Sequence, residues 1–219
     1  VTVVCDGGEQ SFDLEVEVTG RTLPTPSEWR YHLDLWQHPA AVARVEGVTV
    51  WSDAHFEALK PVMKLLADAG QKVVTATLNK DPWNNQCYDA YADMIVWTKD
   101  ADGAWSYDYA VFDRWVELME SLGVDRQINC YSMLPWNNEL HYRDAATGEW
   151  VEVVAEPGQP AFEQMWRPFL ADFVRHLEAK GWLAKTCIAM DERSRTDGDR
   201  RRFSGGERSA VGYRAGRQP

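Results

Sequence analysis

Between residues 31 and 192, short apolar segments that suit buried strands alternate with longer segments whose apolar residues recur at helical spacing. The strand-like segments are 31–37, 72–79, 126–134 and 185–192. The helix-like segments are 52–70, 111–123 and 160–181. Ser52 is a candidate N-cap, and Gly70 and Gly123 are candidate helix ends. Strands that alternate with helices predict right-handed crossovers and a parallel sheet or barrel.

Two further segments interrupt this alternation and have the pattern of β-hairpins. Residues 93–109 are expected to turn at Asp102 and Gly103, and residues 139–154 near Thr147 and Gly148. The longest helix-like segment, 160–181, contains Pro168, which predicts a kink there.

The first 20 residues have a different pattern, in which apolar and polar positions alternate around Gly7 and Gly8. This pattern predicts a β-hairpin or the last strands of a β domain, because one face of such a strand is buried. Pro24 and Pro26 then disfavour both helix and strand. We therefore expect residues 1–27 to be the end of a preceding β domain with its linker, and an α/β domain to begin at residue 28.

Composition and charge limit the classes of protein. Hydrophobic residues make up 45% and charged residues 26% of the chain, which is typical of soluble globular proteins. The formal net charge of -11 argues against a nucleic-acid partner, since phosphate binding needs clustered basic residues. No apolar run approaches the roughly 20 residues of a membrane-spanning helix. The chain opens in a strand-like pattern rather than in a cleavable leader.

Metal and cofactor chemistry is not indicated. The four cysteines, Cys5, Cys87, Cys130 and Cys187, show no C-x-x-C spacing and no paired histidine. This spacing signals neither a zinc site nor a disulfide framework, and we expect the cysteines to be mostly small apolar fillers. We expect no cofactor.

The unusual residues concentrate in the loops that follow the predicted strands. These loops begin at 36–39, 79–85, 131–138 and 190–193. The carboxyl ends of parallel strands meet at one face of a sheet or barrel, so tryptophan, asparagine, histidine and carboxylate side chains should share one rim. The chain contains 11 tryptophans, and a polar cleft lined with aromatic rings suits a saccharide.

Each candidate ligand-binding residue also has a purely structural interpretation. Aromatic rings at the rim suit packing as well as sugar stacking, and the rings concerned are Trp36, Trp83 and Trp136. His38, which precedes Pro39, could stabilise its loop or contact a ligand hydroxyl. The hydrogen-bonding candidates, which could also simply tie the loop to itself, are Tyr131, Asn137 and Asn138.

Asp191 and Glu192 end the last strand-like segment and could be a solvated strand end or a catalytic pair. Their position opposite three aromatic loops favours catalysis. Ordinary glycosidases place two carboxyls about 5 Å or more apart across the scissile bond, which adjacent residues on one strand do poorly. A 2-acetamido group of the substrate could instead attack the anomeric carbon. Asp191 would then orient that amide, and Glu192 would be the general acid.

Several long segments resemble the catalytic domain of glycoside hydrolase family 123. They are "LDLWQHPAAVAR", "DAGQKVVTATLNKDPWNNQCYD", "GAWSYDYAVFDRWVELMESLGVDRQINCYSMLPWN" and "IAMDER", and the likeness runs from about Tyr31 to Arg193. The resemblance implies an exo-acting β-N-acetylgalactosaminidase that acts on a glycan or glycoconjugate with a terminal β-linked N-acetylhexosamine. It also implies retention through an oxazoline intermediate, and a (β/α)8 TIM-type barrel preceded by a β-sandwich. The family's Asp-Glu pair falls on Asp191 and Glu192, and the "DPWN" and "PWN" segments would line the sugar pocket.

The chain departs from the family after Arg193. Only about four β/α units precede that residue, so residues 28–193 are expected to form the N-terminal half of a barrel. Residues 193–219 contain eight Arg and three acidic residues, a local charge of +5. We interpret 194–219 as a disordered or out-of-frame extension, with a basic interaction tail as the alternative. A half barrel has open edges and an incompletely covered core, so the isolated chain could associate with itself or be inactive. The alternative function is therefore an inactive fragment that at most binds carbohydrate.

Overall fold

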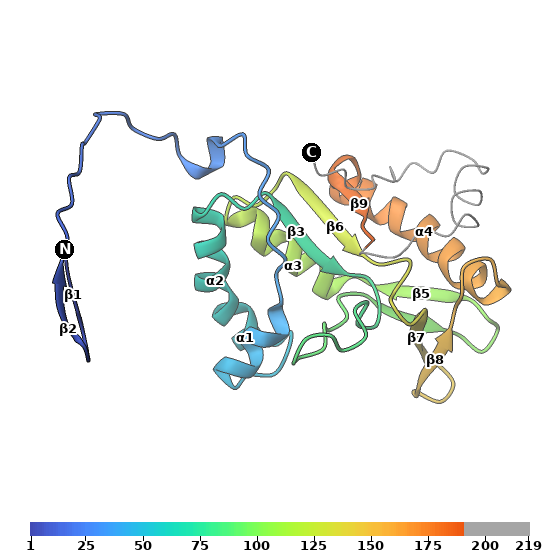
Figure 1. Ribbon diagram of the computed structural model, residues 1–219. Helices are drawn as coiled ribbons and strands as arrows, with labels where there is room; N and C mark the ends of the chain where they lie inside the picture. The colour runs from blue at the N-terminus through green and yellow to red at the C-terminus, as the bar shows by residue number, and fades with distance from the viewer. Residues whose placement is uncertain (191–219) are drawn as a thin grey trace.

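A three-stranded parallel sheet forms the centre of the computed structural model, which describes residues 1–190 (Figure 1). The strand order is β3 (Val73–Thr77), β6 (Gln127–Tyr131) and β9 (Thr186–Ile188). Val74 lies opposite Ile128, and Ile128 opposite Thr186. The prediction of a parallel sheet is confirmed. Within residues 1–190 the sheet does not close into a barrel.

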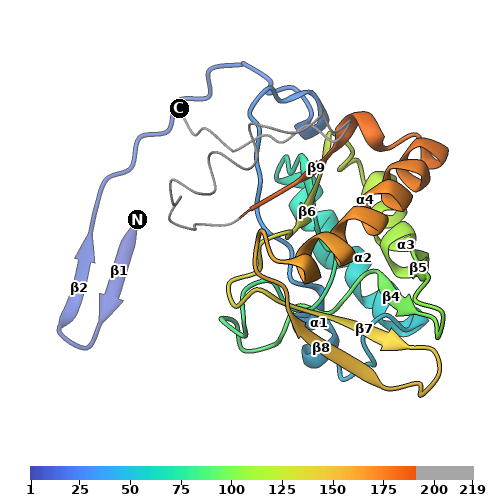
Figure 2. The ribbon, with the colours of Figure 1, turned by 90° about the vertical axis from the view of Figure 1, so that its right-hand side faces the viewer.

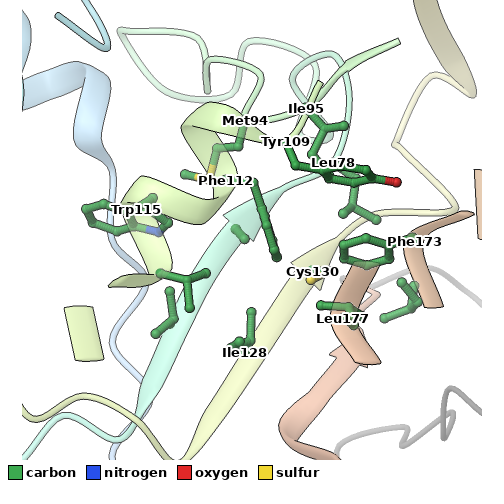
Figure 3. Close-up of a cluster of buried hydrophobic side chains, with 14 of the residues drawn as sticks. Leu78, Met94, Ile95, Tyr109, Phe112, Trp115, Ile128, Cys130, Phe173 and Leu177 are labelled. Carbon is green, nitrogen blue, oxygen red and sulfur yellow. The ribbon is translucent and has the colours of Figure 1, made fainter. Parts of the chain in front are cut away.

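Three long helices cover one face of this sheet (Figure 2). They are α2 (Asp53–Asp68), α3 (Ala110–Ser121) and α4 (Pro160–Lys180). Alternate residues of a strand point to the same side, so Ile128 and Cys130 both face the helices, where Phe112 and Phe173 meet them (Figure 3). α4 continues through Pro168 as one helix. No helix among the described residues is both long and apolar enough to cross a membrane.

The two predicted hairpins are confirmed, and they join into one sheet. Its strands are β4 (Val96–Lys99), β5 (Trp105–Asp108), β7 (Glu139–Asp144) and β8 (Trp150–Val154), in the order β5-β4-β7-β8. The two hairpins meet where β4 pairs with β7 in parallel. Trp97 of β4 is fully buried and stacks on Phe169 of α4, with ring centroids 4.3 Å apart. The hairpin sheet is thereby fixed to α4.

The predicted strand 31–37 is wrong in most of its length. Only Leu33 forms a β-bridge, to Gln71. The side-chain amide of Gln37 makes hydrogen bonds to β3 in place of the backbone pairing of a strand. Gln37 Oε1 accepts from the Thr75 N–H at 2.8 Å, and Gln37 Nε2 donates to the Val73 carbonyl at 3.2 Å. A helix that the sequence reading missed, α1 (Pro39–Glu46), follows at once, with Pro39 in its first turn.

The amino-terminal hairpin stands apart from the rest of the chain (Figure 1). It consists of β1 (Thr2–Cys5) and β2 (Gly8–Ser11), and a short 3-10 helix, η1 (Pro26–Glu28), follows in the linker. The predicted strand pattern beyond residue 11 forms no strand, and its apolar side chains, such as Val18, are exposed. A second 3-10 helix, η2 (Leu183–Lys185), precedes β9.

The cysteines only partly follow the expectation that they fill apolar space. Cys130 is buried and Cys187 is half-buried. Cys5 and Cys87 are exposed, so for these two the expectation is wrong.

Candidate active site

Five aromatic side chains gather at the carboxyl end of the parallel strands, and we call them the ring cluster: Trp36, His38, Trp83, Tyr91 and Tyr131. Trp36, Trp83 and Tyr131 come from three separate loops or strand ends. The Trp36 ring centroid lies 5.2 Å from that of Trp83 and 5.2 Å from that of Tyr131. Trp83 and Tyr131 are 5.0 Å apart. The structure therefore brings three of the sequence-predicted residues into direct contact.

Burial separates the tryptophans into two kinds. Trp83 is 2% exposed and lies under the other rings, whereas Trp36 is 45% exposed. The third predicted tryptophan, Trp136, is 39% exposed. Trp83 therefore has the environment of a packing residue, while Trp36 and Trp136 offer ring surface to a ligand.

His38 joins the cluster through Tyr91, which the sequence reading missed. The His38 and Tyr91 rings are 3.9 Å apart, and Tyr91 lies 4.3 Å from Trp83. His38 Nε2 is buried and has no hydrogen-bond partner within residues 1–190. Burial lowers the pKa of His38, although the Asp89 carboxylate opposes the shift. The imidazole is thus kept neutral.

Tyr91 is a protonated phenol at neutral pH. Burial raises its pKa to about 12, so it can donate a hydrogen bond. Its place in the 79–95 segment gave no signal in the sequence, because this segment has neither a helical nor a strand period.

The loop that carries Trp83 is held by its own side chains. The Asp81 carboxylate accepts from the backbone N–H groups of Trp83 at 3.1 Å and of Asn85 at 2.8 Å. Asn84 and Asn85 have positive φ angles of 51° and 56°, a conformation that asparagine tolerates better than most residues. The turn thus fixes the direction in which Trp83 leaves the backbone.

Asn137 and Trp136 tie the next loop to this one. Asn137 Nδ2 donates to Asn84 Oδ1 at 3.1 Å, and Asn137 Oδ1 accepts from the Glu139 N–H at 3.1 Å. The Trp136 N–H donates to the Pro82 carbonyl at 2.9 Å. Asn137 therefore has the loop-tying contacts that were one of its two interpretations.

The last described residues lead into the cluster. The Ala189 N–H donates to the Cys130 carbonyl at 2.9 Å, and Ala189 packs against Trp83, Tyr91 and Tyr131. Asp191 and Glu192, the predicted catalytic pair, lie outside the described residues.

Polar side chains that the sequence did not single out lie on the face of the parallel sheet opposite the three helices. Asn129 Nδ2 donates to Asp34 Oδ2 at 3.0 Å, and Asn129 Oδ1 accepts from Gln127 Nε2 at 2.6 Å. Burial raises the pKa of Asp34, whose Oδ1 is buried without a partner among residues 1–190. This side of the sheet, opposite the three helices, is therefore polar. Among the described residues, no group of His, Cys, Asp and Glu is arranged to hold a metal ion.

A neutral imidazole, a protonated phenol and exposed indole rings lie at the carboxyl end of the parallel strands, an arrangement that suits a carbohydrate ligand. The profile of the glycoside hydrolase 123 catalytic domain matches residues 36–204. The chain therefore belongs to glycoside hydrolase family 123.

A solved family 123 glycoside hydrolase from Clostridium perfringens, described for the details of glycolipid glycan hydrolysis, is similar in structure. The TM-score is 0.79 and the sequence identity 34%, and the match covers 91% of this chain. This chain spans only 36% of the length of that relative. The comparison with curated proteins gave no match.

Proposed function

We propose that this chain carries the first part of a retaining β-N-acetylhexosaminidase site of the exo-β-N-acetylgalactosaminidase type. The substrate would be a glycan or glycoconjugate with a terminal β-linked N-acetylhexosamine. Family membership supports hydrolysis of a glycosidic bond. The observation that carries the proposal is the ring cluster, because Ala189, two residues before Asp191, packs directly against it.

In the proposed mechanism the substrate supplies its own nucleophile. The acetamido carbonyl oxygen attacks the anomeric carbon as the bond to the leaving oxygen breaks, and Glu192 protonates that oxygen. Asp191 orients the acetamido N–H and stabilises the positive charge that develops on the resulting oxazoline. Water, deprotonated by the Glu192 carboxylate, then opens the oxazoline, and the β configuration is retained.

The ring cluster would bind the sugar during these steps. The exposed Trp36 ring offers a surface for the apolar face of the pyranose, and Trp136 offers a second one. His38 Nε2, which is buried, neutral and without a partner among residues 1–190, would hydrogen-bond a sugar hydroxyl that reaches it. Tyr131 and Asn137 lie at the same rim, the latter as a tie between loops.

We also propose the architecture behind this site. Residues 28–193 would be the N-terminal half of a (β/α)8 barrel, and residues 1–27 the last strands of a β-sandwich with its linker. The parallel order β3-β6-β9, with helices on one face only, supports the half barrel. The isolated hairpin β1-β2 supports a separate first segment.

The first experiment compares two substrates with the purified 219-residue chain. One is a nitrophenyl 2-acetamido-β-galactoside, and the other is the matching β-galactoside with a hydroxyl in place of the acetamido group. Turnover of the first alone is expected if the acetamido group is the nucleophile. Equal turnover of both would contradict substrate assistance.

A variant pair tests the general acid. Glu192→Gln should lose most activity on substrates with poor leaving groups and much less on activated aryl glycosides, since only the former need protonation. Glu178→Gln, an exposed carboxylate of α4, is the matched control and should change neither activity. Equal loss on both kinds of substrate in Glu192→Gln would remove that residue from the role.

A second candidate function is sugar binding without turnover. It is favoured by one observation, that the ring cluster is assembled from residues 36–131, without Asp191 or Glu192. Binding of a methyl 2-acetamido-β-galactoside without hydrolysis of the nitrophenyl substrate would select this function. The open edges also suit self-association, which sedimentation analysis would detect.

A further inference from the structure

A pocket lies away from the ring cluster, where the hairpin sheet meets the first turns of α4. Its volume is about 300 Å³, at the lower end of the range for small-molecule sites. Its principal lining residues are Lys99, Trp105, Tyr142, Val153, Gln164 and Met165. This pocket belongs to no site described above.

The position of Lys99 follows from the strand period. Lys99 stands two residues after Trp97 on β4, so both side chains leave the same face of the hairpin sheet. Trp97 packs against Phe169 in the middle of α4. Lys99 lies further along the strand, beside Ala161, Gln164 and Met165 of the first turns of α4, which line the same pocket.

Lys99 differs from every other lysine of the chain, and all seven lysines lie within residues 1–190. Six place their ammonium against an oxygen acceptor: Lys60, Lys64, Lys72, Lys80, Lys180 and Lys185. Lys99 Nζ lies instead over two aromatic rings, 5.4 Å from the centroid of Trp105 and 5.7 Å from that of Tyr142. Within the described residues, no carboxylate forms an ion pair with it.

The acidic residue opposite Lys99 in the sheet does not pair with it. Asp144 lies opposite Lys99 in the β4-β7 register. Its Oδ1 accepts from the N–H groups of Ala146 at 2.8 Å and Thr147 at 3.1 Å. Asp144 is thus bonded within the β7-β8 turn. It forms no ion pair with Lys99 among the described residues, so the ammonium in the pocket is open to an external anion.

The two rings give the pocket a second property. Trp105 and Tyr142 are half-buried and meet edge to face, with centroids 5.1 Å apart. Such rings offer apolar surface to the C–H face of a pyranose, and the Gln164 amide can both donate to and accept from hydroxyl groups. Ammonium, aromatic surface and amide together match a sugar ring that carries a carboxylate.

We propose that this pocket binds an acidic monosaccharide unit, with the sugar carboxylate on Lys99 and its ring against Trp105 and Tyr142. The site would be separate from the proposed active site, and its occupation requires neither Asp191 nor Glu192. It goes beyond the proposed function, because a hydrolase with such a site would favour glycoconjugates that also carry an acidic sugar.

The test uses probes that differ in one group. Methyl β-glucuronide and methyl α-N-acetylneuraminide are titrated into the 219-residue chain, with methyl β-glucoside as the neutral match of the first, and binding is followed by saturation-transfer NMR. At least one acidic probe should bind at least about tenfold more tightly than the glucoside, and the preference should weaken with added salt. Absence of binding by both acidic probes, or affinities of both acidic probes no higher than that of the glucoside, would overturn the proposal.

Variants locate the binding. Lys99→Gln should abolish the preference for the acidic probe, and Lys99→Arg should keep it because the charge remains. Lys60→Gln, an exposed lysine paired with Glu57, is the control and should bind like the unmodified chain. Thermal unfolding of each variant checks the fold. A Lys99→Gln chain that folds normally and retains the preference would exclude this pocket.

Turnover separates this proposal from the proposed function. Lys99→Gln should leave hydrolysis of the nitrophenyl 2-acetamido-β-galactoside unchanged, since that substrate carries no acidic sugar. A chain that binds the acidic probe but hydrolyses nothing would support the pocket and count against the proposed activity.

Discussion

Two tryptophans of the ring cluster, Trp83 and Trp36, should respond differently to substitution, because one is buried and the other is exposed. Trp83 is 2% exposed, with rings on several sides. Truncation of a buried tryptophan to alanine costs about 3–5 kcal/mol, because apolar contact is lost and a cavity remains. Trp83→Ala should therefore remove about that much of the free energy of unfolding.

Trp36 should behave differently because nearly half of it faces solvent. It is 45% exposed and contacts only the rings of Trp83 and Tyr131 within the cluster. Aromatic pairs contribute about 0.5–1.5 kcal/mol beyond their buried area, so Trp36→Ala should cost about 1–2 kcal/mol. If Trp36 stacks on the sugar, the same variant should weaken binding of a methyl 2-acetamido-β-galactoside about tenfold, equivalent to about 1.4 kcal/mol.

Urea unfolding followed by far-UV circular dichroism measures the stability term. The midpoints should fall in the order unmodified chain, Trp36→Ala, Trp83→Ala, with a shared denaturant slope. Trp150→Ala is the matched control, since Trp150 is 50% exposed and packs against His141 outside the cluster, with ring centroids 4.5 Å apart. It should resemble Trp36→Ala in stability and the unmodified chain in sugar binding. Equal stability losses for Trp36→Ala and Trp83→Ala, or full sugar affinity in Trp36→Ala, would refute the reasoning.

Three further predictions concern the scaffold. Gly70→Ala should lower the thermal unfolding temperature more than Gly123→Ala. Both glycines have φ near +90°, but only at Gly70 would the new Cβ lie 2.7 Å from the Trp29 ring. Equal losses for the two variants would contradict this prediction. Phe169→Ala, which empties the contact between α4 and the hairpin sheet, should cost about 3–5 kcal/mol in urea unfolding, and a loss below about 1 kcal/mol would show that the sheet does not depend on it. Burial holds the pKa of His38 below its ordinary 6.5, so as the pH falls the unfolded chain takes up a proton before the folded chain does, and the free energy of unfolding decreases below pH 6.5. His38→Gln should therefore flatten the dependence of the free energy of unfolding on pH between pH 7 and 5. An unchanged slope would be evidence against this role of His38.

Periodic segments were predictable because their pattern is repeated many times. The buried strands β3 and β6 carry β-branched residues, and α2 and α4 carry apolar residues on one face, so local sequence and tertiary burial agree. The same agreement allowed the convergence of Trp36, Trp83 and Tyr131 to be expected, since strand ends of a parallel sheet share one edge.

The sequence-based predictions were wrong or incomplete where the structure depends on contacts of single side chains rather than on a repeated pattern. The segment 31–37 has the alternation of a strand, but Gln37 and Gln71 bond to backbone groups that a strand would otherwise pair. Tyr91 enters the ring cluster from a segment without period, through contacts with His38 and Trp83 that no local signal records. Asp34 and Asn129 meet across 95 residues of sequence, which only the register of the folded sheet determines.

The ring cluster also bears on how much of a glycosidase this chain can be. Its contacts run between residues 36 and 131, and Ala189 packs against it, so one side of the proposed sugar site is assembled among the described residues. Trp83 is already buried there, and His38 is already held neutral. Preorganised rings bind a sugar without further ordering, whereas hydrolysis also needs the carboxylates in register with the anomeric carbon. Affinity for the 2-acetamido sugar should therefore survive in this chain even where turnover does not. Measuring binding and turnover on one sample separates the contribution of the ring cluster from that of Asp191 and Glu192.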